Sequence, residues 1–295
     1  MDEIYKKKDG YYNKNNKKIT DKKTLDFIKT IYIAPAYKNV IIFKNDNKKL
    51  AQGYDVDGRL QIIYRPTFIK KQTNKKYCRM LKFNSAIPKI EQEIRSRLKN
   101  KEYDKKKQVA IIVRIIAHCH FRVGSESYKH RYNSFGITTI QSKHVKIINN
   151  NITIEFTGKK GIKNLCIINN AELVKHLKNL KKLSTNSHLF HINGKPISAK
   201  SINSFIKSFG EFTSKDFRTW YANKYMIEEL KKSKPIEDTI LKRKKQIKNA
   251  LDNVAQKLHH TSAICKKSYI DNGIIDKFVI NGKIVNYIKY LKSKC

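Results

Sequence analysis

The sequence predicts an α+β protein with a small β-rich N-terminal domain, residues 1–73, and a larger, mainly α-helical domain, residues 74–295. Two observations lead to this prediction. Short β-branched runs between turn residues dominate the first part of the chain, and apolar residues at helical spacing dominate the second. One stretch of the second part, residues 144–169, returns to the alternating pattern of strands and indicates a small antiparallel β-meander.

The N-terminal domain is predicted from short strand-like runs. Ile31–Ala34 and Asn39–Phe43 are rich in β-branched residues, and Gln61–Tyr64 follows an Asp-Gly turn. Such runs, bounded by turn residues, are typical of strands and hairpins. The polar and basic strip 69–76 has almost no apolar residue, so we expect the domain boundary inside it.

Helical spacing in the second domain begins at Arg79 and continues to Lys101, with an interruption expected at Pro88. Residues 108–121 are apolar on nearly all sides, which indicates a buried helix. The meander, residues 144–169, is expected to have three strands, with a glycine-flanked lysine at the tip of its second turn. Further helices are predicted over Ala171–Leu183, Ser198–Phe209 and Ile274–Leu291, within 231–248, and from Ser214, which would cap its helix.

The chain is strongly basic. It holds 64 Lys and Arg against 24 Asp and Glu, a net charge of +40. Residues 1–73 contribute 17 basic and 8 acidic residues, or +9, which leaves +31 for the rest. A charge of this size indicates an extended phosphate surface such as nucleic acid as the partner.

Cysteine usage and hydropathy indicate an intracellular protein in a reducing compartment. The five cysteines are scattered and form no Cys-x-x-Cys pair, so we expect neither disulfides nor a zinc site. His118 and His120 flank Cys119, but a helix would splay the two rings apart, so no metal site is expected there. The longest apolar run, Val109–Ala117, is too short to span a bilayer, and the N-terminal residues lack the apolar core of a signal peptide, so we expect no membrane partner.

His260 and Tyr269 lie nine residues apart. In one uninterrupted helix they would point to opposite faces, but a break at Thr261-Ser262 would let both side chains converge. A tyrosine beside a histidine and arginines is a candidate covalent nucleophile toward phosphate. The alternative is a half-buried aromatic residue on a surface helix.

Three cations could complete such a site. Arg122 directly follows the predicted buried helix and would be held stiffly, as a catalytic cation requires. Lys159, at the tip of the meander's second turn, could reach into a site formed elsewhere, although an ordinary exposed lysine is the alternative. Arg218 is expected near the N-terminus of the helix that starts at Ser214.

Taken in chain order, these residues resemble a known set. The spacings of the five residues are 37, 59, 42 and 9, and the segments around them, together with one segment of the N-terminal domain, resemble the poxvirus-type type IB DNA topoisomerases from about residue 54 to residue 275. The matching segments are Tyr54–Gln61, Phe121–Tyr128, Phe135–Ile140 with Lys143–Val145, Phe156–Lys160, Lys215–Thr219, and His260-Thr261 with Tyr269.

The resemblance implies the catalytic fold shared by tyrosine recombinases and type IB topoisomerases, and relaxation of supercoiled duplex DNA. It implies that Tyr269 attacks one phosphodiester, forms a 3′-phosphotyrosyl intermediate, and releases a 5′-hydroxyl that later reseals the strand. Arg122, Arg218 and His260 would stabilise the transferring phosphoryl group, and Lys159, working with Arg122, would be the general acid. No cofactor is expected, neither ATP nor metal.

The resemblance also implies contacts with double-stranded DNA. The expected contact residues are Gln61 and Tyr64 in the N-terminal domain, and Gly124, Tyr128, Lys215 and Asn223 around the site. We expect a monomer whose two basic domains clamp the duplex. A viral origin is expected, with the enzyme in the virion and the host-cell cytoplasm and the nucleus as an alternative.

Two other functions fit part of the pattern. A tyrosine recombinase shares the five residues but usually carries a histidine three positions before the second arginine, where this chain has Lys215. Recombinases also commonly have a helical N-terminal domain. A non-catalytic basic DNA-packaging protein would need none of the five residues at these spacings.

Overall fold

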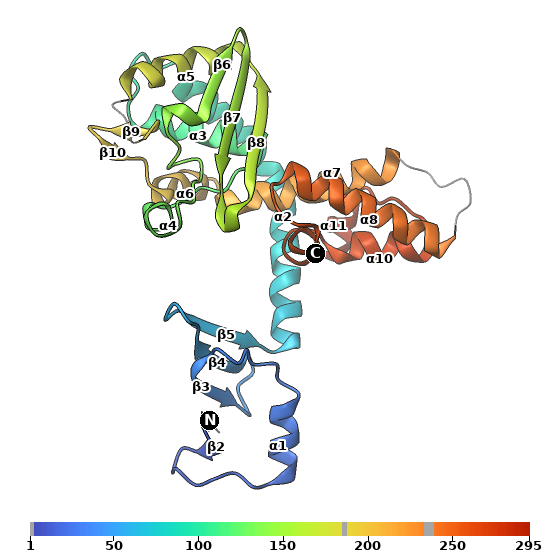
Figure 1. Cartoon of the computed structure of the whole chain (residues 1–295). Helices are drawn as coiled ribbons and strands as arrows, with labels where there is room; N and C mark the ends of the chain where they lie inside the picture. The colour runs from blue at the N-terminus through green and yellow to red at the C-terminus, as the bar shows by residue number, and fades with distance from the viewer. Residues whose placement is uncertain (1–2, 185–187, 233–238) are drawn as a thin grey trace. The chain divides into compact units, whose positions relative to one another are not determined.

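The computed structural model describes residues 3–184, 188–232 and 239–295 (Figure 1). The chain divides into two compact units, Met1–Tyr77 and Cys78–Cys295. The division lies inside the long helix α2 (Pro66–Leu98). The strip 69–76, which the sequence predicts to be a link, is part of this helix, because it contains no glycine or proline and its lysines and glutamine favour helices.

Helix α2 also continues through Pro88, where the sequence predicts an interruption. Proline removes one backbone hydrogen bond and usually breaks or kinks a helix. Here Phe83, Ile90 and Ile94, on both sides of the proline, are at most 1% exposed. Packing of these side chains keeps the segment helical where local propensity alone would not.

The first unit is an antiparallel sheet with one helix. The sheet has the order β2-β1-β3-β4-β5, and α1 (Lys22–Lys29) lies between β2 and β3 in the chain. Buried apolar residues from the strands and the helix form its core, which includes Ile4, Ile28 and Ile42. The strands are β1 (Glu3–Lys7), β2 (Gly10–Asn13), β3 (Lys38–Phe43), β4 (Lys49–Tyr54) and β5 (Leu60–Tyr64).

Ile31–Ala34 is not a strand, so this prediction is wrong. The segment directly follows α1, and the N–H of Ile31 donates to the carbonyl of Ile28, as at a helix end. Ile31 is buried in the core of the unit while Tyr32 is 83% exposed. The β-branched residues of this run therefore serve core packing rather than strand pairing.

Helices dominate the second unit, as the sequence predicts, and the α+β class is confirmed. None of the described helices is both long enough and apolar enough to cross a membrane. After α2 come α3 (Lys105–Cys119), α4 (Glu126–Tyr132), β6 (Val145–Ile148), β7 (Asn151–Thr157), β8 (Lys163–Asn169), α5 (Ala171–Leu183), β9 (His191–Ile192), β10 (Lys195–Pro196), α6 (Ala199–Lys207), α7 (Ser214–Lys232), α8 (Ile240–Lys257), α9 (Ser262–Ser268), α10 (Asn272–Asn281) and α11 (Tyr287–Lys294).

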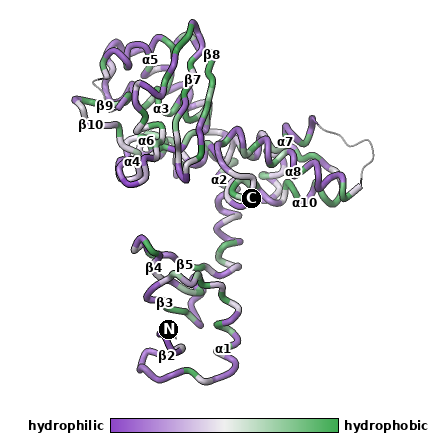
Figure 2. Tube along the Cα trace, in the orientation of Figure 1, coloured by the Kyte–Doolittle hydropathy of each residue, from purple (hydrophilic) through white to green (hydrophobic). Residues whose placement is uncertain are grey.

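The meander is confirmed. Strands β6, β7 and β8 pair in sequence order, with Val145 opposite Ile154 and Ile152 opposite Ile168. Along β7 hydrophobic and hydrophilic residues alternate (Figure 2). Because the side-chain period of a strand is two, this alternation buries one face of the sheet and fixes its register.

Helix α3 is buried along most of its length, as the sequence predicts. Asp104 caps its N-terminus, where the carboxylate accepts from the N–H of Lys107 at 2.8 Å. The helix ends at His120, whose φ of 57° is left-handed. The chain then leaves the core through the fully buried Phe121 and delivers Arg122 at the end of a rigid support.

The break between α8 and α9 lies where the sequence predicts it. Thr261 caps α9, and its hydroxyl accepts from the N–H of Ile264 at 3.4 Å. The preceding His259 has a left-handed φ of 54°. At α7 the cap prediction is off by one residue: the helix begins at Ser214, and the Asp216 carboxylate accepts from the N–H of Thr213.

Two disulfides contradict the prediction of unpaired cysteines. Cys78 bonds to Cys295 and Cys119 bonds to Cys166, with Cα–Cα distances of 5.5 and 5.7 Å. Cys265 is free and buried. The bonded residues are 217 and 47 positions apart, so only the tertiary fold brings them together, and spacing along the chain cannot reveal them.

Candidate active site

Arg122 is held at the start of a tight loop. Its Nη1 donates to the carbonyl of His259 at 3.3 Å, which joins the end of α3 to the break between α8 and α9. Two residues later the backbone of Gly124 (φ +92°) lies against Gly136, where a Cβ on Gly124 would come within 2.8 Å of the Gly136 Cα. Only glycine fits this approach, so the loop that carries Arg122 has little freedom.

Arg218 is the centre of the arrangement. It lies in the first turns of α7, is 2% exposed, and its Nε donates to the Tyr269 hydroxyl at 3.3 Å. Its Nη2 donates to the carbonyl of Leu258 at 2.7 Å, and its Nη1 donates to the carbonyl of His120. One guanidinium therefore connects α3, the end of α8 and the tyrosine.

The side chains of His260 and Tyr269 meet, which the break between α8 and α9 makes possible. Their rings stack with centroids 4.9 Å apart and an interplanar angle of 7°. Tyr269 follows α9 directly and is 6% exposed. The alternative of a half-buried aromatic residue on a surface helix does not describe this position.

The surrounding cations favour ionisation of the tyrosine. Burial favours the neutral phenol, but the charge and hydrogen bond of Arg218, with the charges of Arg122 and Lys215, outweigh it and lower the pKa of Tyr269 below its usual value. The Lys215 Nζ lies 5.8 Å from the centroid of the tyrosine ring. A phenol in this setting loses its proton more readily than tyrosine in water.

His260 is neutral at pH 7 in the free protein. Burial, with the charges of Arg218 and Arg122, lowers its pKa to about 4. Its Nδ1 lies 3.3 Å from the carbonyl of Thr261, while the buried Nε2 has no hydrogen-bond partner in the described part of the chain. A buried nitrogen without a partner is costly, so Nε2 is a natural contact for a ligand oxygen.

Acidification should destabilise the fold. Burial lowers the pKa of His120 to about 3 and those of His259 and His260 to about 4, whereas an unfolded histidine has a pKa of about 6.5. Below pH 6.5 the unfolded chain binds protons that the folded chain does not. Each of the three histidines should therefore remove up to about 1.4 kcal/mol of stability per pH unit between about pH 6.5 and 5, measured by denaturant unfolding.

The control uses two substitutions. Asparagine tolerates the left-handed backbone of position 259. His259→Asn should therefore reduce the pH dependence of the unfolding free energy by the contribution of one histidine. His130→Asn makes the same substitution at a position where the side chain is 77% exposed and shows the effect of the change outside the core. Equal pH dependence in the parent and in His259→Asn would contradict the buried-histidine account.

Lys159 lies apart from the tyrosine but shares a cavity with Arg122. It sits in the turn between β7 and β8, and its Nζ lies 5.4 Å from the centroid of the Tyr128 ring. The cavity has a volume of about 240 Å³ and is lined by Arg122, Gly124, Ser125, Tyr128, Ser134, Phe135 and Lys159. The structure thus gathers Arg122, Arg218, His260 and Tyr269, and Lys159 lines this cavity together with Arg122.

The residues predicted to contact DNA have different surroundings. Gly124 and Tyr128 line the cavity, and Lys215 is exposed beside Tyr269. Asn223 is fully buried, and its amide bonds to backbone groups, including the carbonyl of Tyr269 at 2.9 Å. The prediction of Asn223 as a DNA contact therefore does not agree with the structure, because both ends of its amide are hydrogen-bonded to backbone groups inside the protein.

Gln61 and Tyr64 lie on β5 of the first unit. The Gln61 amide donates to the Asp55 carboxylate at 2.8 Å, and Tyr64 packs on Phe68 with ring centroids 5.1 Å apart. Tyr64 is 39% exposed. Its surface is therefore available to a ligand of this unit.

Comparison with known proteins identifies the family. A family model described as the catalytic core of eukaryotic DNA topoisomerase I matches residues 65–290. The chain is 32% identical over 302 residues to DNA topoisomerase 1B of Acanthamoeba polyphaga mimivirus, covering 95% of this chain and 89% of that protein. The chain belongs to the type IB DNA topoisomerases. The resemblance to the poxvirus-type enzymes is thereby confirmed.

Poxvirus relatives are more distant. This topoisomerase is 24% identical over 273 residues to DNA topoisomerase 1 of Rabbit fibroma virus (strain Kasza), covering 90% of this chain and 85% of that protein. A solved structure of XerH site-specific recombinase bound to difH substrate aligns with 78% of this chain and 60% of that chain at 14% identity and a TM-score of 0.36. That score is too low to bear on fold or function. The family model and the viral relatives favour relaxation of supercoiled DNA over the recombinase and packaging alternatives.

Sequence reasoning missed two residues near the site of the topoisomerase. The His259 ring packs on Phe121 with centroids 5.0 Å apart, and its Nε2 bonds to the carbonyl of Cys119 at 3.0 Å. Asp271 is 2% exposed and its N–H donates to the side-chain oxygen of Asn223. For His259 the sequence offers one indication, its place next to His260. For Asp271 it offers none, because many polar residues precede helices.

Proposed function

We propose that Tyr269 is the nucleophile of this topoisomerase and that Arg122, Lys159, Arg218 and His260 assist it. The observation that carries the proposal is the environment of the phenol. Arg218 Nε lies 3.3 Å from its hydroxyl, and the His260 ring stacks on it at 4.9 Å. A tyrosine whose pKa is lowered by such neighbours is suited to attack phosphorus.

In the proposed reaction the Tyr269 oxygen attacks one phosphodiester of duplex DNA. The new bond joins the phenolic oxygen to phosphorus, and the bond from phosphorus to the 5′-oxygen breaks. The strand end stays attached to the protein as a 3′-phosphotyrosine, and the freed 5′-hydroxyl later attacks in reverse and reseals the strand. The bond energy is retained in the phosphotyrosine, so the cycle requires no ATP.

Arg122, Arg218 and His260 are proposed to stabilise negative charge on the nonbridging phosphate oxygens. Fixed donors act most strongly in a site with little water, and Arg218 and His260 are 2% and 7% exposed. His260 would contact the phosphate through Nε2. The anion would raise the pKa of His260 from about 4, which would favour protonation of the ring as DNA binds.

Lys159 is proposed as the general acid. The 5′-alkoxide is a poor leaving group unless it is protonated, and an ammonium group can supply the proton. The cavity that Lys159 shares with Arg122 supports this role, because a strand end placed there would lie near both cations. Tyr128, whose ring lies below the ammonium group, would hold it in place.

We infer that residues 1–73 form a DNA-clamp domain and residues 74–295 the catalytic domain, acting as a monomer on double-stranded DNA. Gln61 and Tyr64 would approach a groove from the first domain. Lys215, Gly124 and Tyr128 would contact the strand near the scissile phosphate. Asn223 is not included, because it is fully buried.

The viral relatives support a viral protein that acts on DNA in the cell. We propose that it works in the virion and in the host-cell cytoplasm, with the nucleus as an alternative. The disulfides make the oxidation state of the preparation a variable in every assay of this enzyme.

The affinity for DNA should fall steeply with salt. The net charge of +40 is spread over both parts of the chain, and each phosphate neutralised by Lys or Arg releases counterions. With at least about six such contacts, the affinity should fall about 10³-fold between 50 and 200 mM salt. Fluorescence anisotropy with labelled duplex measures the slope, and a slope near zero would contradict binding through phosphates.

The central test is to trap the intermediate. Supercoiled plasmid is incubated with the protein and a metal chelator, without ATP, and the reaction is stopped with denaturant. We expect relaxed plasmid and a nicked fraction that carries covalent protein. The cut strand should accept phosphate at its 5′ end from a kinase and resist extension at its 3′ end by terminal transferase. Protein attached to the 5′ end would sink the proposal.

A further inference from the structure

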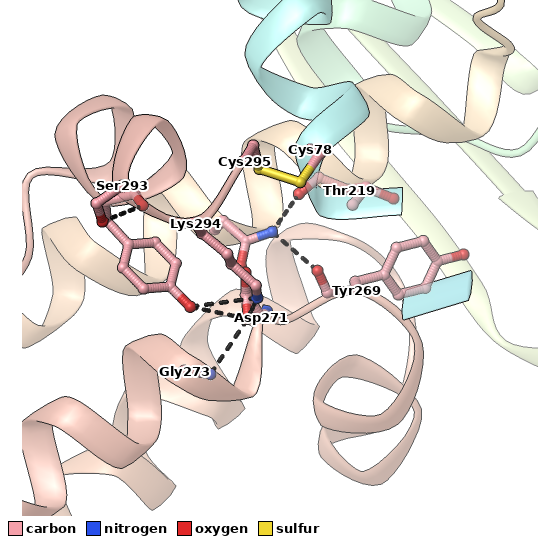
Figure 3. A network of polar contacts seen from close by, with 10 residues as sticks. Cys78, Thr219, Tyr269, Asp271, Gly273, Ser293, Lys294 and Cys295 are labelled. Carbon is pink, nitrogen blue, oxygen red and sulfur yellow. Dashed lines mark hydrogen bonds and ion pairs between the residues drawn. A yellow bond between two sulfur atoms is a disulfide. The ribbon is translucent and has the colours of Figure 1, made fainter. Parts of the chain in front are cut away.

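Helix α11 ends beside a buried carboxylate (Figure 3). The Lys294 Nζ lies 3.0 Å from both carboxylate oxygens of Asp271. The Tyr290 hydroxyl approaches the same carboxylate at 3.4 Å, and the N–H of Gly273 donates to it at 3.2 Å. Because Asp271 is 2% exposed, its charge depends on these partners, and removing the lysine would leave a buried charge poorly paired.

The position of α11 is closely fitted. A Cβ on Gly273 would lie 2.1 Å from the Tyr290 hydroxyl, so a larger residue at the start of α10 would require the end of this tyrosine side chain to shift. On the same helix Leu291 is fully buried, and the Tyr287 ring lies 5.5 Å from that of Trp220 on α7. Helix α11 is therefore packed against the helix that carries Arg218.

Asn223 connects this carboxylate segment to the tyrosine. Its side-chain oxygen accepts from the N–H of Asp271 at 2.7 Å, and its Nδ2 donates to the carbonyls of Tyr269 at 2.9 Å and Thr219 at 2.7 Å. An amide has one acceptor end and one donor end, so this orientation is fixed by its partners. The fully buried Asn223 thus sets the backbone on both sides of Ile270 relative to α7.

A disulfide fixes the end of α11. Cys295, next to Lys294, is bonded to Cys78 on α2. Lys294 can keep its contact with Asp271 only while the end of α11 stays in place, and the disulfide restricts where that end can move. Cys295 is exposed, so a small reductant can reach the bond.

We propose that Lys294, Asp271 and Asn223 are positioning residues for the Tyr269 hydroxyl, and that the Cys78–Cys295 disulfide makes this positioning sensitive to redox conditions. The inference rests on the proposed role of Tyr269 as nucleophile. Reduction by a dithiol would transfer two electrons and two protons to the disulfide, giving two thiols and an oxidised dithiol. The end of α11 would then be freed, and the phenol would lose its alignment with the phosphate.

The first test compares two lysines on α11. Lys294→Met removes the cation that pairs with Asp271, whereas Lys292→Met removes the same charge from an exposed position on the same helix. At saturating protein on supercoiled plasmid, Lys294→Met should lower the single-turnover rate of adduct formation by about 10- to 100-fold, as a misplacement of about 1 Å can. Lys294→Arg should restore part of the rate, and Lys292→Met should react like the parent.

Affinity and folding are measured in parallel. Because both methionine variants lose one positive charge, their affinities for duplex DNA should match, so a defect confined to Lys294→Met would lie in the bound complex. Circular dichroism sets a temperature at which every variant is folded. Equal rates for Lys294→Met and Lys292→Met would overturn the positioning role.

The second test addresses the disulfide. Oxidised parent should form adduct on the order of tenfold faster than parent treated with a dithiol. Cys295→Ser should react at the slower rate under both conditions. A Cys119→Ser/Cys166→Ser double variant lacks the other disulfide and should keep the redox response. Equal rates of oxidised parent and Cys295→Ser would overturn the role of this bond.

Failure of this inference can be told from failure of the proposed nucleophile. If Tyr269→Phe still forms adduct, the nucleophile itself is wrong and the inference falls with it. If Tyr269→Phe forms none while Lys294→Met reacts like the parent, the nucleophile stands and only the positioning role is lost.

Discussion

Replacing Tyr269 with phenylalanine should abolish plasmid relaxation and the covalent adduct while leaving the fold and DNA binding unchanged. The substitution removes one oxygen and keeps the ring, which is 6% exposed and stacks on His260. Within residues 3–184, 188–232 and 239–295 no other hydroxyl is hydrogen-bonded to Arg218, so no substitute nucleophile is expected at this position. Relaxation on agarose gels and adduct formation on denaturing gels measure the loss.

Tyr221→Phe is the matched control. Tyr221 lies on α7, and its ring is 4.6 Å from that of His120, so the variant also removes one hydroxyl from a tyrosine near the core. It should relax plasmid like the parent. Relaxation by Tyr269→Phe at the parental rate would refute the assignment of the nucleophile.

Arg218→Ala should lower the rate of adduct formation by about 10² to 10³. The arginine donates to the Tyr269 hydroxyl and would also donate to the phosphate, so its loss should affect both ionisation of the phenol and stabilisation of charge. Its loss should also lower the melting temperature, because the buried carbonyls of His120 and Leu258 would lose their donor. Rapid-quench assays and thermal unfolding measure the two effects.

Arg218→Lys separates chemistry from folding. Lysine keeps the charge but cannot place donors on three separate groups as a planar guanidinium does. We expect it to recover some stability and little of the rate when both variants are assayed at a temperature at which they are folded. A rate for Arg218→Ala within about threefold of the parent would show that phosphate stabilisation lies elsewhere.

The sequence was informative where a local pattern has one structural meaning. The alternation of residues 144–169 predicts the meander, and the polar Thr261-Ser262 pair predicts the helix break that lets His260 meet Tyr269. The roles of the five candidate residues came from a resemblance to a family. Composition or spacing alone could not distinguish Lys159 from an ordinary turn lysine.

The sequence was uninformative where distant segments decide the outcome. Pro88 does not interrupt α2, because buried neighbours outweigh local propensity. Neither disulfide could be predicted, since the bonded cysteines meet only in the fold. Asn223 looks like a polar ligand-binding residue on a helix, and only the coordinates reveal that its amide holds Tyr269 and Asp271.

A guanidinium has five N–H bonds. In the described part of the chain Arg218 directs three of them at Tyr269, His120 and Leu258, so one N–H on each terminal nitrogen remains for an incoming anion. Two parallel N–H bonds match two oxygens of one phosphate. Any substitution of Arg218 therefore changes the packing of three segments and the proposed phosphate contact at the same time.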